Sequence, residues 1–220
     1  FMCGALAIGL GSAVIALFGN PSQFSSSLGL EVYRAGPESG ICQQVPKLSP
    51  KNKQVEQYVR EKVDSVKYQQ DIIKKLTGII QIPSESYDSL GSIGEDDRWD
   101  IFFQVEDYIK VTYPTVFENV KLDHANTHGL ILTWEGSVPS SKAKPILMLA
   151  HQDVVPVLAE NVKDWAHPPY DGHYDGEIIW GRGATDDKGY LISIIESVDL
   201  LIKSGFKPKR TVILAFGCDE

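Results

Sequence analysis

Two uninterrupted apolar runs constrain the fold more than any other feature of this sequence. One is Pro145-Ile-Leu-Met-Leu-Ala150, followed by His151-Gln-Asp153, and the other is Thr211-Val-Ile-Leu-Ala-Phe216, followed by Gly-Cys-Asp-Glu220. Neither run alternates apolar with polar residues, and this pattern is typical of strands buried on both faces of a sheet. The sequence therefore predicts two buried strands, each ending in side chains that can bind a metal ion or a proton.

Helical patterns separate these predicted strands. Apolar residues recur at helical spacing over residues 53–76, 98–112 and 188–203, and shorter strand-like stretches cover residues 130–134 and 177–180. Strands that alternate with helices are typical of an α/β domain. We therefore expect an α/β fold with a mainly parallel sheet flanked by helices.

The first 19 residues differ from the rest because they carry no charged side chain, and the first ionisable residue is Glu31. An apolar stretch of about 18 or more residues can span a bilayer, whereas the apolar core of a signal peptide is usually shorter, about 7–15 residues. We expect residues 1–19 to form a transmembrane signal anchor, with a cleaved signal peptide as the alternative. Residues 20–50 are rich in Ser, Gly and Pro and indicate a stalk or linker.

The net charge and the cysteine content limit which classes of function and of metal site the chain can have. The net charge is -8 at pH 7 and no Lys and Arg cluster is present, which argues against a nucleic-acid partner. The three cysteines have no Cys-x-x-Cys spacing, so no zinc ribbon is indicated. Carboxylates and imidazoles are therefore the groups from which a site would be built.

His151 and Asp153 stand just past the end of the first apolar run. Residues two apart in an extended chain point the same way. A metal-bound histidine usually has its second ring nitrogen oriented by an acceptor, and Asp153 is the candidate for that role. The alternative is a histidine satisfied at a strand end beside a turn-forming Asp.

Asp186 and Asp187 follow the turn Gly181-Arg-Gly183 and precede a predicted helix. An Asp at a helix start is favoured as a cap, which explains one acid better than two. A metal-bridging carboxylate is the second explanation. A phosphate-binding loop is a weak third, because neither Gly-Lys-Ser/Thr nor a third spaced Gly follows.

Asp219 and Glu220 follow the second apolar run, so they open on the same edge as His151 if the two strands are parallel. A set of imidazole and carboxylate ligands suits a divalent cation, and zinc is the commonest choice when imidazole is present. His124 and His128 are four apart, but they lead into a strand through Gly129, so we expect them to be surface residues.

Several of these segments resemble the di-zinc aminoacylase and carboxypeptidase family of metallopeptidases, and are most similar to its fungal vacuolar carboxypeptidase S branch. The segments are residues 151–156, 165–172, 180–189 and 211–220, within a resemblance that runs from about Leu76 to Glu220. The resemblance implies that residues 51–220 are the N-terminal part of a zinc-peptidase-like catalytic domain. It also implies that the lid domain and the remaining zinc ligands come from sequence beyond residue 220.

The resemblance assigns roles to individual residues. His151 would bind one zinc ion, Asp186 would bridge two, Asp153 would orient His151 and Glu220 would be the general base. A cis peptide bond would join Asp186 to Asp187. The remaining ligands would include an acid at position 221, so we expect the 220-residue chain alone to have no useful peptidase activity.

The implied activity is zinc-dependent release of a C-terminal amino acid from short peptides. The implied location is the vacuolar lumen, with the membrane as a partner of the N-terminal segment, and secretion is the alternative. Two other functions stay open: hydrolysis or synthesis of N-acyl amino acids, and a catalytically inactive, membrane-tethered binding module.

Overall fold

The computed structural model describes residues 48–220. The predicted anchor at residues 1–19 and nearly all of the predicted stalk lie outside the described residues. None of the helices within residues 48–220 combines the length and the hydropathy that a membrane span requires. The helices are α3 (Lys53–Val63), α4 (Val66–Ile80), α5 (Ile101–Thr112), α6 (Pro114–Asn119) and α7 (Lys188–Lys203), with short 3-10 helices at Asp97–Asp100 and Ala159–Asp164.

The main sheet has four strands in the order β1-β2-β6-β3. Their bounds are β1 (Lys121–Ala125), β2 (Gly129–Trp134), β3 (Ile146–His151) and β6 (Val212–Gly217). Only β3 and β6 are parallel, and the other two pairs are antiparallel. The fold class α/β is confirmed, but the prediction of a mainly parallel sheet is wrong for the part of the chain that the structure describes.

A hairpin accounts for this difference. β1 was not predicted, and it pairs with β2 through a tight turn at Asn126 and Thr127, whose φ angles are 47° and 69°. Three residues, Asn126–His128, lie between the last paired residues Ala125 and Gly129, and a connection this short joins two antiparallel neighbours. The hairpin therefore adds two antiparallel strands to the β3–β6 pair. A second, separate hairpin joins β4 (His173–Tyr174) to β5 (Ile179–Trp180), where the sequence predicted one short strand.

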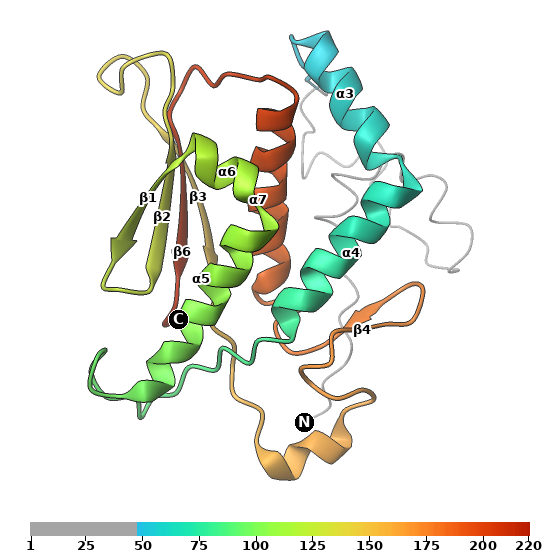
Figure 1. Cartoon of the computed structure of the whole chain (residues 1–220), viewed down its shortest axis with the longest axis vertical. Coiled ribbons are helices and arrows are strands. Elements are labelled where there is room, and N and C mark those ends of the chain that lie inside the picture. Colours follow the sequence, from blue (N-terminus) through green and yellow to red (C-terminus); the bar gives the residue numbers. More distant parts are fainter. Residues whose placement is uncertain (1–47) are drawn as a thin grey trace, which may run out of the picture.

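α5, α6 and α7 cover one face of the main sheet, and α3 and α4 pack against α7 farther from the sheet (Figure 1). Side chains of β2 and β6 that point toward α5 and α7 are almost completely buried. Burying large apolar side chains contributes about 1.5–3 kcal/mol each, so this layer is the main source of stability. The central members of the core are Phe102, Ile109, Leu130, Leu132, Leu191, Ile195, Leu214 and Phe216.

β3 departs from its predicted burial. It is an edge strand, and Leu147 and Leu149 on its uncovered face are 56% and 66% exposed. On the other face, Met148 and Ala150 pack against the core. The prediction that both apolar runs are buried on both faces is wrong within residues 48–220. β3 has β6 as its only neighbour there, and in β6 only Leu214 and Phe216 are buried, because the helices lie on one side of the sheet.

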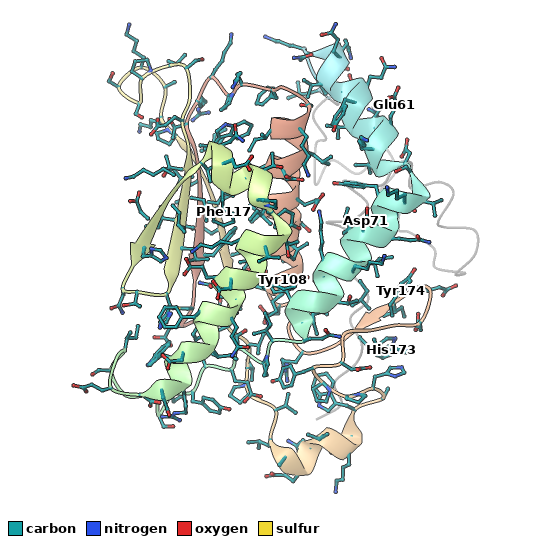
Figure 2. The ribbon with its side chains drawn as sticks, viewed as in Figure 1. Glu61, Asp71, Tyr108, Phe117, His173 and Tyr174 are labelled. Atoms are coloured by element: carbon teal, nitrogen blue, oxygen red, sulfur yellow. The ribbon has the colours of Figure 1, made fainter. Side chains whose placement is uncertain are left out.

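The predicted helix over residues 53–76 is two helices. Asp64 ends α3, and the Ser65 side chain caps α4 by accepting a hydrogen bond from the Tyr68 N–H. α4 continues past the predicted stop at Gly78. A Cβ at residue 78 would collide with the hydroxyl of Tyr108, which reaches from α5 toward α4 (Figure 2) and donates to the Lys75 carbonyl at 2.8 Å. Gly78 is therefore required by helix packing.

Candidate metal centre

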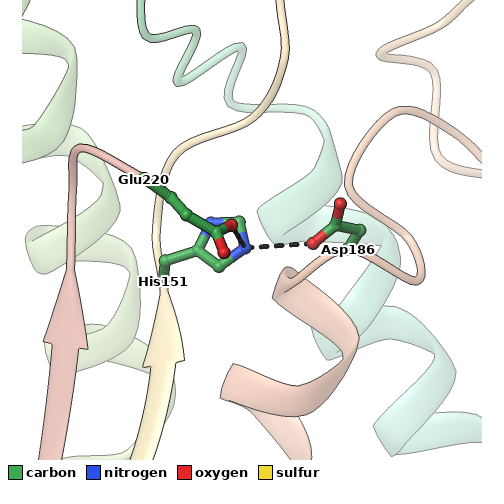
Figure 3. A group of neighbouring side chains, drawn as sticks. All are labelled: His151, Asp186 and Glu220. Atoms are coloured by element: carbon green, nitrogen blue, oxygen red, sulfur yellow. Dashed lines mark hydrogen bonds and ion pairs between the residues drawn. The ribbon is translucent and has the colours of Figure 1, made fainter.

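Three side chains from distant parts of the sequence converge at one edge of the β3–β6 pair (Figure 3). His151 ends β3, Glu220 follows β6, and Asp186 lies in the turn before α7. His151 Nε2 is 3.0 Å from Asp186 Oδ1 and 2.7 Å from Glu220 Oε2. The predicted convergence of these residues is present.

The orientation of the His151 ring follows from its other nitrogen. Nδ1 lies 3.0 Å from the main-chain carbonyl of Asp153 and 3.3 Å from its carboxylate Oδ1. Because a carbonyl only accepts hydrogen bonds, Nδ1 carries a proton and Nε2 points toward the two exposed acids. Asp153 therefore faces His151 as predicted, but its main chain makes the closer contact.

The buried Asp153 carboxylate links several parts of the site by hydrogen bonds. It is 2% exposed, and its Oδ2 accepts hydrogen bonds from the Ser86 hydroxyl at 2.7 Å and the Glu220 N–H at 3.2 Å. Its Oδ1, which faces His151, has no hydrogen-bond partner among the described residues. A buried carboxylate is costly unless hydrogen bonds or opposite charges compensate for its lost hydration. The hydrogen bonds from Ser86 and Glu220 therefore hold the Asp153 carboxylate in place.

The turn that carries Asp186 and Asp187 is shaped by packing. Gly183 has a φ of +82°, and a Cβ there would lie 2.6 Å from Val154 Cγ1. Glycine is needed where the backbone adopts a positive φ at such close range. The peptide bond between Asp186 and Asp187 is cis, as the family resemblance implied.

Asp187 precedes α7 but makes no capping hydrogen bond with its side chain. Its Oδ2 instead accepts a hydrogen bond from the His151 N–H at 3.1 Å. Asp187 therefore holds the main chain of the histidine while Asp186 faces its ring. The alternative explanation of this acid as a helix cap does not fit the observed contacts.

Lys188 is a second buried contributor that the sequence did not reveal. It is 0% exposed, and its Nζ donates hydrogen bonds to the carbonyls of Ile79 at 3.1 Å and Ile82 at 2.5 Å. Burial lowers the pKa of Lys188 to about 7, and the nearby Asp153 carboxylate opposes the shift. Lys188 thereby ties the start of α7 to the end of α4, which fixes the position of the acidic turn.

The exposed part of the site is strongly acidic. The side chains of Asp186 and Glu220 are 78% and 70% exposed, whereas that of His151 is 16% exposed. Burial alone would lower the pKa of His151, but hydrogen bonding to Asp186 and the charges of Asp153, Asp187 and Glu220 outweigh burial and raise it. A positive charge is therefore favoured at this position, whether carried by a proton or by a bound cation.

Ser86 and Lys188 are functional candidates that the sequence alone did not single out. Ser86 lies in a stretch from Ile79 to Ser92 that could only be interpreted as turn-rich. A lysine at a helix start is also an ordinary surface feature. Neither residue has a local pattern that reports burial, so only the packed structure reveals them.

The other histidine pair is not part of a metal site in the described residues. His124 is partly exposed and lies 3.1 Å from the Glu106 carboxylate, in line with a surface role. His128, also expected at the surface, is 3% exposed and packs against Trp99, Phe102 and Phe103. That prediction is wrong for His128, because the aromatic residues of α5 and the preceding turn cover it.

The donor set fits zinc. One imidazole nitrogen and two carboxylate oxygens lie within 4.8 Å of one another in His151, Asp186 and Glu220, and no other group of three or more such residues is found within residues 48–220. Zinc accepts both imidazole nitrogen and carboxylate oxygen as ligands, and His151 and Asp186 offer one of each. The orphaned Oδ1 of Asp153 behind the imidazole is also what a metal-bound histidine would require.

Comparison with known proteins identifies the family to which this chain is similar. Residues 147–220 match the model described as Peptidase family M20/M25/M40. Carboxypeptidase S of Saccharomyces cerevisiae is 38% identical over 193 residues, covering 84% of this chain and 32% of the relative. An N-fatty-acyl-amino acid synthase/hydrolase of Mus musculus is 33% identical over 151 residues, covering 68% of this chain and 28% of the relative.

A solved structure agrees with these sequence matches. The di-peptidase Dug1p from Saccharomyces cerevisiae superimposes with a TM-score of 0.54 and 27% identity, covering 75% of this chain and 34% of that chain. The chain thus spans about a third of the length of the relatives it matches. On the combined evidence of motifs, fold and site, this chain belongs to peptidase family M20/M25/M40.

Proposed function

We propose that this chain supplies half of the active site of a zinc-dependent exopeptidase of the carboxypeptidase S type, which releases a C-terminal amino acid from short peptides. The observation that carries the proposal is the convergence of His151, Asp186 and Glu220 on one edge of the sheet. Their order along the chain is the order in which the family resemblance assigns ligand, bridging ligand and base. The similarity to Carboxypeptidase S supports the substrate class.

Each residue has a distinct role in this proposal. His151 and Asp186 would hold zinc, with Asp186 shared between two ions. Zinc bound there would supply a Lewis acid for the scissile carbonyl and lower the pKa of the attacking water. Asp153 would keep the proton of His151 on Nδ1, so that Nε2 is free to bind.

Glu220 is suited to move a proton. Its N–H is anchored to the buried Asp153 carboxylate, while its own carboxylate lies beside His151 Nε2 and is 70% exposed. It would take a proton from the attacking water and pass it to the nitrogen of the leaving amino acid. A fixed main chain with an accessible carboxylate suits a general base.

A related activity is the second candidate. The similarity to an N-fatty-acyl-amino acid synthase/hydrolase favours hydrolysis or synthesis of N-acyl amino acids. Both activities act on an amide bond next to a free amino-acid carboxylate, so the same His151, Asp186 and Glu220 would serve either one. The third candidate, a catalytically inactive binding module, requires that the protein hold its ligand without turnover.

The test uses the protein from the complete reading frame, purified with and without added zinc. We expect release of C-terminal amino acids from blocked dipeptides, faster than cleavage of N-fatty-acyl amino acids, and loss of that activity on chelation. Preference for the fatty-acyl substrates would favour the second candidate. Zinc binding without hydrolysis of either substrate would favour the binding module.

The 220-residue chain provides a second comparison. We expect it to bind zinc more weakly and to show no useful turnover, because only some of the expected ligands are present. Robust hydrolysis by the purified 220-residue chain would contradict the site assignment.

We further propose that residues 1–19 anchor the protein in a membrane with its catalytic part in the vacuolar lumen. The uncharged N-terminal stretch supports this, and fractionation of the tagged full-length protein tests it. Recovery in the medium would instead favour secretion.

A further inference from the structure

The segment that follows α4 is held beside the metal centre by its main chain. Residues 84–86 run parallel to residues 152–154: the Val154 N–H donates to the Ser84 carbonyl at 2.8 Å, and the Ser86 N–H donates to the Val154 carbonyl at 3.2 Å. Glu85 and Val154 form an isolated parallel bridge. This pairing sets the register that brings the Ser86 side chain to Asp153.

The Ser86 hydroxyl donates to Asp153 Oδ2 at 2.7 Å, which is a short hydrogen bond to an ionisable acceptor. The same oxygen accepts the Glu220 N–H at 3.2 Å. With two donors on Oδ2, the carboxylate cannot rotate freely, and Oδ1 stays turned toward His151 Nδ1 at 3.3 Å. Through the Asp153 carboxylate, the Ser86 hydroxyl therefore affects both the orientation of the His151 ring and the position of the Glu220 main chain.

We propose that Ser86 is a positioning residue of the metal centre, whose hydroxyl holds the Asp153 carboxylate in the orientation that directs His151 Nε2 toward the metal and fixes the main chain of Glu220. This inference rests on the proposed function for its catalytic consequence. Groups that orient metal ligands from behind typically change metal affinity by about 10- to 100-fold when removed. Ser86 acts one contact further from the metal, so we expect an effect near the lower end.

The chain offers a matched control. Ser84 lies two residues earlier in the same segment and is 0% exposed, and its hydroxyl donates to the main-chain carbonyl of Gln152 at 2.7 Å. Among the described residues, the donors to the Asp153 carboxylate are Ser86 and Glu220, and the Ser84 hydroxyl is not one of them. Ser84→Ala removes a buried hydroxyl from the same bridge without changing the carboxylate, so it reports the structural cost of such a loss.

The experiment compares Ser86→Ala, Ser86→Thr and Ser84→Ala in the full-length protein. Zinc affinity is measured by competition with a chelator of known affinity, and kcat and KM are measured over a range of pH. We expect Ser86→Ala to weaken zinc binding about tenfold and to lower kcat with little change in KM. Ser86→Thr, which keeps the hydroxyl, is expected to restore both, and Ser84→Ala to lower Tm without either change.

A readout without metal separates this inference from the proposed function. Amide hydrogen exchange in the zinc-free protein is followed in peptides that contain residues 151–153 and 218–220. Ser86→Ala is expected to exchange several-fold faster than wild type in both peptides, and Ser84→Ala is not. Unchanged exchange in Ser86→Ala, or equal changes in zinc affinity for the two Ala variants, would overturn the positioning role. A wild-type protein that binds no zinc would refute the proposed function, while the exchange result would still decide the role of Ser86.

Discussion

The candidate metal centre has two parts, here called the floor and the rim, which differ in burial and in the groups that contact their polar side chains. The floor comprises Gln152, Asp153 and Lys188, each at most 2% exposed and tied to the main chain of neighbouring segments by hydrogen bonds. The rim comprises the carboxylates of Asp186 and Glu220, which are mostly exposed and meet at His151 Nε2. Contacts within the protein position the floor, whereas we propose that a bound cation completes the rim. Floor substitutions should therefore change stability first, and rim substitutions should change activity first.

The largest expected effect tests the rim. In the full-length protein, Glu220→Gln should lower kcat/KM by at least about 100-fold, because it removes the general base and keeps the side-chain shape. Zinc content and Tm should stay close to wild type. Steady-state kinetics with blocked dipeptides and metal analysis of the purified variant check both parts.

The neighbouring acid serves as the control for that prediction. Asp219 is exposed and is not among the acids that lie within ion-pair distance of His151, so Asp219→Asn should keep most of the activity. Loss of zinc together with activity in Glu220→Gln would instead make Glu220 a metal ligand, and the assignment of the terminal acids would then be shifted by one residue.

The next effect tests the floor. Lys188→Met removes the donor to two carbonyls at the end of α4 and should lower the free energy of unfolding by about 1–3 kcal/mol. Lys74→Met changes an exposed lysine on α4 and should stay within about 0.5 kcal/mol. Urea unfolding of both variants gives the comparison. Equal stabilities would show that Lys188 does not hold the floor.

A smaller expected effect is a pH dependence of zinc affinity that comes from His151 beside the rim carboxylates. The acidic neighbours raise the pKa of His151 in the metal-free protein, and zinc must displace that proton to reach Nε2. Below the raised pKa, apparent zinc affinity should therefore fall by at most about tenfold per pH unit from this proton. Chelator competition at several pH values measures the slope. An affinity that is independent of pH across this range would contradict a role for His151 as ligand.

The smallest expected effect is a pH dependence of stability that comes from Lys188 in the floor. The folded-state pKa of Lys188 is lowered from 10.5 to about 7, so between these values the unfolded chain binds more protons than the folded chain. Stability of the wild type relative to Lys188→Met should therefore rise with pH in this window, by at most about 1.4 kcal/mol per unit. Unfolding curves for both proteins at several pH values test the sign, and a declining difference would contradict it.

The two apolar runs show which features of a strand can be predicted from sequence and which cannot. Both were correctly predicted as strands, and β6 lies between two neighbours as a central strand should. β3 has the same composition but lies at an edge, with Leu147 and Leu149 exposed. A run of apolar residues reports a preference for burial, but it does not report which segments are present to cover it.

The residues of the candidate site also divide into those that a local sequence pattern indicates and those that only the packed structure reveals. His151, Asp153, Asp186 and Glu220 could be selected from sequence because each follows a strand or a glycine turn and has the chemistry of a ligand or base. Ser86 and Lys188 could not, because a serine in a turn and a lysine at a helix start are common on protein surfaces. His128 was misplaced for a related reason: its burial depends on the aromatic rings of α5, which are distant in sequence.

Local sequence patterns were sufficient to predict the strands at the apolar runs, the helices with regular apolar spacing, and the ligand-type residues where strands and turns end. These follow from short-range periodicity and from the chemistry of individual side chains. The antiparallel hairpin, the edge position of β3 and the hydrogen bonds that converge on Asp153 arise only when distant segments pack together. Each of these depends on contacts between segments far apart in the chain, such as Ser86 with Asp153, and no local pattern encodes which distant partners will meet.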